Sequence, residues 1–356
     1  MIPGLDILLG DSPGAVPDPS LPIPARVVVA ERLGQPAAWE LHYGLVGGES
    51  DLPLLVDDRF AASGAFALVL RHRGGDHCLA AGPVQGQRIE IKRGTAGSTL
   101  VVLGGDLTRR MDVEAKIFEH AAGDDLEAVR VVTAAYGMQL AGDAATGISR
   151  DVAGGTLMQR GTDLQFVQRL ARRHGRRFWV RTSPELVHTA RFAAPDPAGE
   201  AVATLSVEPE GALEAVQIHW DSEQPTAASA TDIDAVSGET VSSQATPASA
   251  GLGAMPLSAV VDAPRSALIG SAGDSLAELT ARSDAAVAAG AWFLRARATV
   301  LIDRVEAVPR VDDLVQLEGL GSRHSGRWHV LGATYRLQAV GSEVELELRR
   351  DGWGPG

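Results

Sequence analysis

The chain has 356 residues, of which 45% are hydrophobic and only 4% aromatic, and its length predicts two or three compact units rather than one core. With 40 glycines and 19 prolines it is rich in turns, which favours a β-rich architecture over a helical bundle. Its formal net charge of −13 excludes a protein that coats nucleic acid or an anionic membrane, since both require a positive surface.

Cysteine content and the N-terminus indicate the cellular compartment in which the protein is made. The single cysteine, Cys78, excludes an intrachain disulfide and a cysteine-rich zinc site, and we expect it to be an inert thiol. The N-terminus lacks the charged and apolar regions of a signal peptide. No run of residues approaches the ~20 apolar residues that span a bilayer. We therefore expect cytoplasmic synthesis and no direct membrane insertion of the free protein.

The first third of the chain predicts an arm followed by strands. Residues 1–25 contain six prolines, so we expect an extended N-terminal arm that is mobile or lies across a neighbouring subunit. From residue 26 to 106, short apolar segments alternate with glycine-rich gaps, which is typical of an antiparallel sheet or small barrel. Its strands are expected at 26–32, 39–46, 66–73, 77–81, 88–92 and 99–103.

Residues 107–200 predict a small α+β unit. The segment 107–116 has the pattern of a strand, and a helix is expected at 124–136, where Asp124 is the N-cap and Glu127 completes a capping box. Gly137 ends this helix and begins a glycine-rich linker. Further strands are expected at 156–159, 176–181 and 186–192.

The strongest local pattern lies between Gly161 and Val180. Thr162 is the expected N-cap of a helix, Gln165 completes its capping box, and Gly175 is the expected residue of positive φ after its end. In the strand that follows, Phe178 and Val180 share one face. A helix this short is marginal alone in water, so it must dock on a sheet. Its apolar side is Leu164, Phe166, Val167, Leu170 and Ala171.

Residues 201–356 return to a β pattern. The segment 225–253 is poor in large apolar residues and is expected to be an exposed loop. The longest helix is expected at 275–295, with Ser275 and Glu278 as its capping box. The strands are expected at 202–207, 213–220, 297–304, 314–317, 327–335 and 343–349.

Motifs that carry chemistry are missing from the sequence. There is no GxSxG, HExxH or Walker A pattern, and His42, His72 and His77 lack the spacing of metal ligands. Three acidic doublets stand beside turns or helix starts, where carboxylates cap backbone N–H groups. We therefore expect no enzymatic activity, and no catalytic, cofactor-binding or metal-binding residues. The doublets are Asp57–Asp58, Asp124–Asp125 and Asp312–Asp313.

Two other segments have alternative interpretations. The basic run from Arg172 to Arg177 is either a helix C-terminus followed by a solvated strand, or a patch that meets an acidic partner, and both remain open. The glycine-rich segment 319–335 predicts a hairpin in which Trp328 is a packing anchor, because its glycines do not precede a helix that could bind phosphate.

Taken together, these motifs resemble the phage late control gene D family, the baseplate hub of contractile tails, which is related to the front half of VgrG spike proteins. A helix ending in Tyr136-Gly137 precedes a second helix, in the order that the family has. The resemblance covers about residues 107–353. It rests on Thr162, Asp163, Phe166, Arg169 and Leu170 in that second helix, and on Asp313, Val315, Leu317, Gly319, Gly326, Trp328 and Val330 near the end.

The resemblance implies a mainly β fold with an α+β insert. Residues 26–106 and 201–356 would each form a tube-like antiparallel β-barrel, and residues 107–200 would be the insert. A homotrimer with two barrels per chain would present a ring of six to a sixfold inner tube. Its partners would be the inner tube protein, baseplate wedge proteins and a separate spike protein with OB-like and β-helix domains, because the chain ends at Gly356. The protein would then be part of a phage tail or contractile injection particle.

Two alternatives belong to other functional classes. A cell-wall hydrolase of the same particle would need a carboxylate pair or metal site in a cleft. A ligand-binding β-sandwich protein would need an aromatic-lined groove around Trp39, Trp220 or Trp328.

Overall fold

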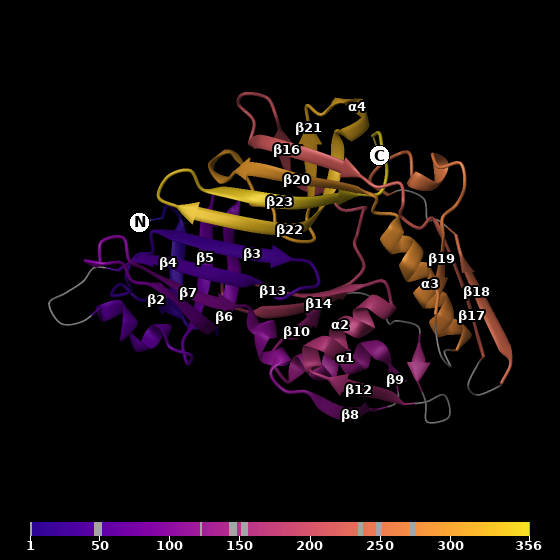
Figure 1. Cartoon of the computed structure of the whole chain (residues 1–356), viewed down its shortest axis with the longest axis horizontal. Coiled ribbons are helices and arrows are strands. Elements are labelled where there is room, and N and C mark those ends of the chain that lie inside the picture. The colour runs from indigo at the N-terminus through magenta and orange to yellow at the C-terminus, as the bar shows by residue number, and fades with distance from the viewer. Residues whose placement is uncertain are drawn as a thin grey trace.

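The computed structural model describes residues 2–45, 52–121, 123–141, 148–150, 156–233, 238–246, 251–270 and 275–355. Figure 1 shows three regions: a large sheet, an α+β region below it, and a helix with a small sheet at one side. The prediction of a mainly β fold with an α+β insert is confirmed. No described helix is long and apolar enough to cross a bilayer.

The large sheet has 13 strands in the described part of the chain. Its first half uses strands from the N-terminal third, and its second half uses strands between residues 201 and 350. The first half consists of β1 (Leu5–Leu9), β2 (Val16–Pro17), β3 (Arg26–Arg32), β4 (Ala38–Gly44), β5 (Ala65–His72), β6 (Gly75–Glu90) and β7 (Thr99–Gly105). The second half consists of β15 (Ala201–Ser206), β16 (Leu213–Trp220), β20 (Leu294–Leu301), β21 (Leu314–Glu318), β22 (Gly326–Gln338) and β23 (Glu343–Arg350).

The two halves are continuous with each other. β3 pairs antiparallel with β22, and the path of paired strands runs from β16 through this junction to β2 (Figure 1). One hydrophobic core includes Trp39 and Phe66 from the first half and Trp328 from the second half. The two β units are therefore joined rather than separate, and their description as two barrel domains stays a prediction.

A buried ion pair fastens this junction. Arg310 donates through Nε to Glu31 Oε2 at 3.0 Å, and through Nη1 to the carbonyl of Cys78 at 2.8 Å. Its Nη2 also pairs with Glu31 Oε1. Tyr335 of β22 donates to the carbonyl of Pro309 at 2.7 Å. Because Glu31 lies on β3 and Cys78 on β6, Arg310 connects the second half of the sheet to two strands of the first.

Several strand predictions are corrected by the pairing. The prediction of an extended N-terminal arm is wrong, because β1 pairs with β5 over five residues and Ile2 is buried in the core. The strands expected at 77–81 and 88–92 are one 16-residue strand, β6, which pairs first with β5 and then with β7. The strand expected at 39–46 is β4, and Val46 lies outside the described residues.

The α+β region has its own hydrophobic core. The prediction of a strand at 107–116 is wrong, because residues Leu107–Asp112 form a 3-10 helix, η3, in which Asp106 accepts the Thr108 N–H. Most of the linker expected after Gly137 lies outside the described residues. The elements are β8 (Lys116–His120), β9 (Gly123–Asp124), α1 (Asp125–Ala134), β10 (Gln139–Ala141), β11 (Ser149–Arg150), β12 (Leu157–Gly161), α2 (Asp163–Arg173), β13 (Arg177–Thr182) and β14 (His188–Ala193).

Helix α2 forms as its sequence predicts. Thr162 Oγ1 accepts a hydrogen bond from the Gln165 N–H, and Gln165 Oε1 accepts one from the Thr162 N–H, so the capping box is complete. Gly175 follows the helix with a φ of 65°. The buried face packs against β13, where Phe178 joins the same core.

The prediction of an exposed loop at 225–253 is wrong for the part of this segment that the structure describes. Its described part contains β17 (Ala227–Ile233) and β18 (Thr240–Ala245), which pair antiparallel, while β19 (Ser266–Ile269) pairs parallel with β17. Helix α3 (Leu276–Gly290) packs on this sheet through Val287 against Ala228 and Ala245 (Figure 1). The Ser275–Glu278 capping box is confirmed, but the helix ends five residues before the expected 295, since β20 begins at Leu294.

The remaining short turns complete the chain. They are η1 (Pro53–Leu55), η2 (Asp58–Phe60), η4 (Leu257–Ala259), η5 (Ile302–Arg304) and α4 (Gly321–His324).

Candidate functional site

The three histidines considered as metal ligands do not form a cluster. His42 lies 2.8 Å from Glu40 on its own strand, and His72 bonds the carbonyl of Val305 at 2.7 Å. His77 lies on β6, opposite Leu70 of β5. In the residues that the structure describes, no group of three or more His, Cys, Asp or Glu side chains is placed to hold a metal ion.

The acidic doublets make structural contacts. Asp57 caps η2 and pairs with Arg59 at 2.6 Å, while Asp124 accepts the Leu126 N–H at the start of α1. Asp125 is fully buried beside His174 Nε2 at 2.9 Å, which ties α1 to the end of α2. Asp313 accepts from Arg181 at 3.0 Å. Asp57 and Asp124 thus make the capping contacts that the sequence indicates, whereas Asp125 and Asp313 pair with residues far away in the sequence.

The cysteine and two tryptophans are core residues. Burial raises the pKa of Cys78 to about 12, so the thiolate that would act as a nucleophile is suppressed. Trp328 is fully buried and donates to the carbonyl of His324 at 3.0 Å, and Trp39 is buried against Phe66. Trp220, on β16, is 50% exposed. Two of the three tryptophans proposed for a ligand groove are thus packing anchors.

The basic run Arg172–Arg177 lines a cavity of about 880 Å³ between α2, β13 and α3. His174 turns away from it to Asp125, so the run divides into four arginines facing the cavity and one histidine facing the core. In the described part of the chain, seven arginines and one acidic residue, Asp351, line this cavity. The arginines are Arg169, Arg172, Arg173, Arg176, Arg177, Arg282 and Arg349.

Arg349 is the most deeply placed of these arginines. It is 3% exposed, and its guanidinium carbon lies 4.2 Å from the ring centroid of Trp292. Its Nε donates to His329 Nδ1 at 3.1 Å, whereas its buried Nη2 has no hydrogen-bond partner in the described part of the chain. Burial first, and then the neighbouring Arg177 and Arg295, lower the pKa of Arg349 to about 9. The orientation of this arginine depends on its hydrogen bond to His329.

His329 is held between a donor and an acceptor. An arginine can only donate, so Nδ1 must accept from Arg349 and the ring must be neutral, with Nε2 donating to Asp312 Oδ1 at 3.0 Å. Burial, joined by Arg349, holds the pKa of His329 below its ordinary value even though Asp312 opposes the shift. The chain Asp312–His329–Arg349 thus fixes the guanidinium against Trp292.

A pH dependence of stability follows from this neutral histidine. Because the pKa of His329 is lower in the folded than in the unfolded chain, its contribution is present above about pH 6.5 and is lost as the pH falls. One such group adds at most about 1.4 kcal/mol per pH unit to the slope. We expect His329→Gln, whose amide offers one acceptor and one donor, to flatten the slope between pH 6.5 and 5. Urea denaturation at several pH values measures it; an unchanged slope would show that His329 is protonated equally in both states.

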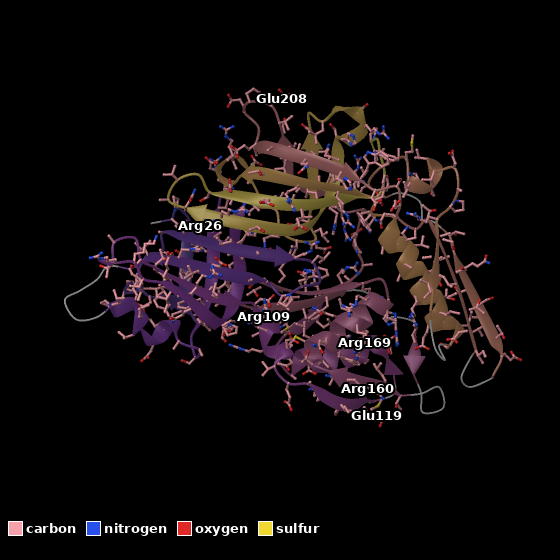
Figure 2. All side chains as sticks on the ribbon, viewed as in Figure 1. Arg26, Arg109, Glu119, Arg160, Arg169 and Glu208 are labelled. Atoms are coloured by element: carbon pink, nitrogen blue, oxygen red, sulfur yellow. The ribbon has the colours of Figure 1, made fainter. Side chains whose placement is uncertain are left out.

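The sheet edges and the tip of the α+β region are the other candidate contact surfaces. β16 pairs with β20 along one edge only in the described structure, and it carries the half-exposed Trp220. At the tip, the outer face of the β8–β12 pair presents Ile117, 77% exposed, and Met158. Glu119 and Arg160 lie there too, at the lower side of Figure 2. Open strand edges and exposed apolar side chains favour pairing with other chains.

Sequence patterns identify the basic run but not the cavity. Arg282 and Arg349 come from α3 and β23, more than 100 residues after the run, and only the docking of α3 beside α2 brings them together. The alternation of β23 places Arg349 with the polar side chains Glu345 and Glu347, which gives no sign of its burial.

Comparisons with known proteins locate the fold. No protein-family model and no curated protein sequence matches the chain. Among solved structures, a tail protein from Neisseria meningitidis MC58 superposes with a TM-score of 0.66 at 15% identity, covering 98% of this chain and 97% of that one. The 43 kDa tail protein of prophage MuSo2 from Shewanella oneidensis gives 0.65 at 10% identity, with 98% of each chain covered.

A third structure comes from a secretion system. The E. coli c3393 protein, a component of the type VI secretion system, superposes with a TM-score of 0.55 at 11% identity, over 100% of this chain and 79% of that chain. At these identities the likeness is one of fold. The chain thus has, over nearly its whole length, the fold of phage tail proteins and of a type VI secretion component, as the sequence resemblance implied.

Proposed function

We propose that the chain is the baseplate hub of a phage tail or contractile injection particle and has a structural rather than a catalytic role. The observation that carries this proposal is the superposition on tail proteins over 98% of the chain, since it includes the insert as well as both halves of the sheet. A fold can host unrelated functions, so the surfaces must also fit. Open sheet edges and an exposed apolar tip fit an assembly subunit.

In this proposal three copies form a ring. Each chain contributes two joined β halves, so a homotrimer would present six β units to a sixfold inner tube and three copies of the insert to a threefold spike. The partners would be the inner tube protein, baseplate wedge proteins and a separate spike protein. The chain would be synthesised in the cytoplasm and would act within the assembled particle.

Deleting the gene from a strain that makes the particle tests the structural role. The expected result is the absence of tubes and complete tails in electron micrographs, because a tube needs the hub as its starting ring, with recovery when the gene is supplied in trans. A particle-associated hydrolase behaves differently: its deletion would leave tails of normal form that fail to penetrate a cell wall. Normal tails in the deletion strain would therefore overturn the proposal.

A further inference from the structure

The cavity between α2, β13 and α3 concentrates positive charge within an acidic chain. The chain has a formal net charge of −13, yet seven arginines and one aspartate line this cavity in the described structure. The aspartate, Asp351, already accepts the backbone N–H groups of Gly251 and Leu252 at 2.8 and 2.9 Å. Four of the arginines, Arg169, Arg172, Arg177 and Arg349, have no ion-pair partner in the described structure, so their charge is left for a ligand to compensate.

The positive charges of the neighbouring arginines disfavour one another. Burial first, and then Arg172, lower the pKa of Arg177, while burial followed by Arg173 and Arg172 lowers the pKa of Arg169. Arg173 reaches Glu278 of α3 at 3.5 Å, a long contact at the border of the cavity. Arginines grouped this way repel each other in the free protein, and an anion among them would relieve that repulsion.

Arg349 gives the cavity a buried donor. Its Nη2 is buried without a hydrogen-bond partner in the described atoms, while Trp292 and His329 hold the rest of the guanidinium in place. A buried donor without a hydrogen bond costs free energy, and a charged donor costs more, unless a ligand accepts the bond. The fixed fork of an arginine suits a carboxylate or phosphate oxygen pair.

The remaining walls indicate the kind of anion. Apolar side chains from α3, from β19 and from the segment after β14 also line the cavity, and the volume of about 880 Å³ far exceeds that of one inorganic anion. Such walls accept the side chains and backbone of an extended peptide. They include Ala285, Ala288, Ala289, Pro195, Pro197 and Ile269.

We propose that this cavity binds an acidic peptide segment of a neighbouring protein, with its Asp or Glu carboxylates on Arg172, Arg177 and Arg349. This proposal adopts the second interpretation of the basic run, a patch that meets an acidic partner. The proposal rests on the proposed function only for the idea that this neighbour belongs to the same particle.

Binding of a fluorescein-labelled hexaglutamate peptide, followed by fluorescence anisotropy, tests the proposal. We expect saturable binding to the full-length protein that weakens as NaCl is raised, because charge contacts are screened. The double variant Arg172→Gln/Arg177→Gln should weaken binding about tenfold or more. Arg26→Gln is the matched control: Arg26 is exposed on β3, away from α2, as Figure 2 shows, and its loss should leave affinity unchanged.

A second variant and two competitors keep the test decisive. Arg349→Met should abolish peptide binding while the circular dichroism spectrum stays that of the parent. No binding by the parent protein, or equal binding by the double variant, would overturn the proposal. If inorganic phosphate competes more strongly than unlabelled hexaglutamate, the cavity is a small-anion site. If a hexathymidine oligonucleotide competes more strongly than that peptide, the cavity is a nucleic-acid site. Either result contradicts the proposal of a peptide site. The subunit count, measured on the same samples, separates failure of this site from failure of the trimer.

Discussion

Replacing Arg310 with Met is expected to destabilise the protein by about 3–5 kcal/mol, the cost of leaving a buried charge without its partner. Glu31 and Arg310 are 7% and 6% exposed, and Arg310 also donates to the carbonyl of Cys78. The substitution would leave the Glu31 carboxylate buried where β3 meets β22. Urea denaturation followed by tryptophan fluorescence measures the loss, since Trp39 and Trp328 lie in the shared core.

Two further variants isolate the pair. The double variant Glu31→Met/Arg310→Met removes both charges and should recover most of the lost stability, as replaced buried pairs often do. Arg32→Gln breaks the neighbouring ion pair with Glu347, whose side chains are 44% and 39% exposed, and should cost about 1 kcal/mol or less. A loss of similar size for Arg32→Gln and Arg310→Met would contradict the role given to the buried pair.

Phe166→Ala is expected to remove about 3–5 kcal/mol from the α+β region, as for other buried phenylalanines. Phe166 is fully buried in α2, and His120 of β8 stacks on it with ring centroids 4.5 Å apart. The core around it is separate from that of the large sheet. Hydrogen exchange should therefore quicken in α1 and α2 while β22 and β23 stay protected, which tests residues 107–200 as a domain.

Phe118→Ala is the matched control for this second prediction. Phe118 lies on the same strand as His120 and is 51% exposed, with its ring edge-on to that histidine at 5.0 Å. Its loss should cost about 1 kcal/mol. If Phe166→Ala instead quickens exchange equally throughout the large sheet, residues 107–200 do not unfold as a unit.

Local signals predicted the helices well. The capping boxes at Thr162 and Ser275, and the glycine at 175, depend on residues within one turn of each other, so they survive any change of tertiary context. The alternation in β23 is equally local, and it places Val344, Leu346 and Leu348 in the core as expected. The ends of α1 and α3 were both placed too late, and Glu127 pairs with Arg130 instead of completing a capping box at α1.

Long-range pairing explains the errors. Strands β17 and β18 consist mostly of Ala, Ser and Thr, which suits their close packing against α3, and small side chains give no strong alternation. Strand β1 alternates Leu5, Ile7 and Leu9, but the prolines around it conceal that pattern. The junction of β3 with β22 joins residues some 300 positions apart, and neither strand has a sequence pattern that indicates which strand it pairs with.

The proposed hub requires three copies of this chain in one assembly. Native mass spectrometry of the purified protein at several concentrations measures the number of copies. We expect a species of three times the chain mass that persists on dilution and is replaced by no dimer. A monomer at every concentration, alone and with the spike protein added, would contradict it.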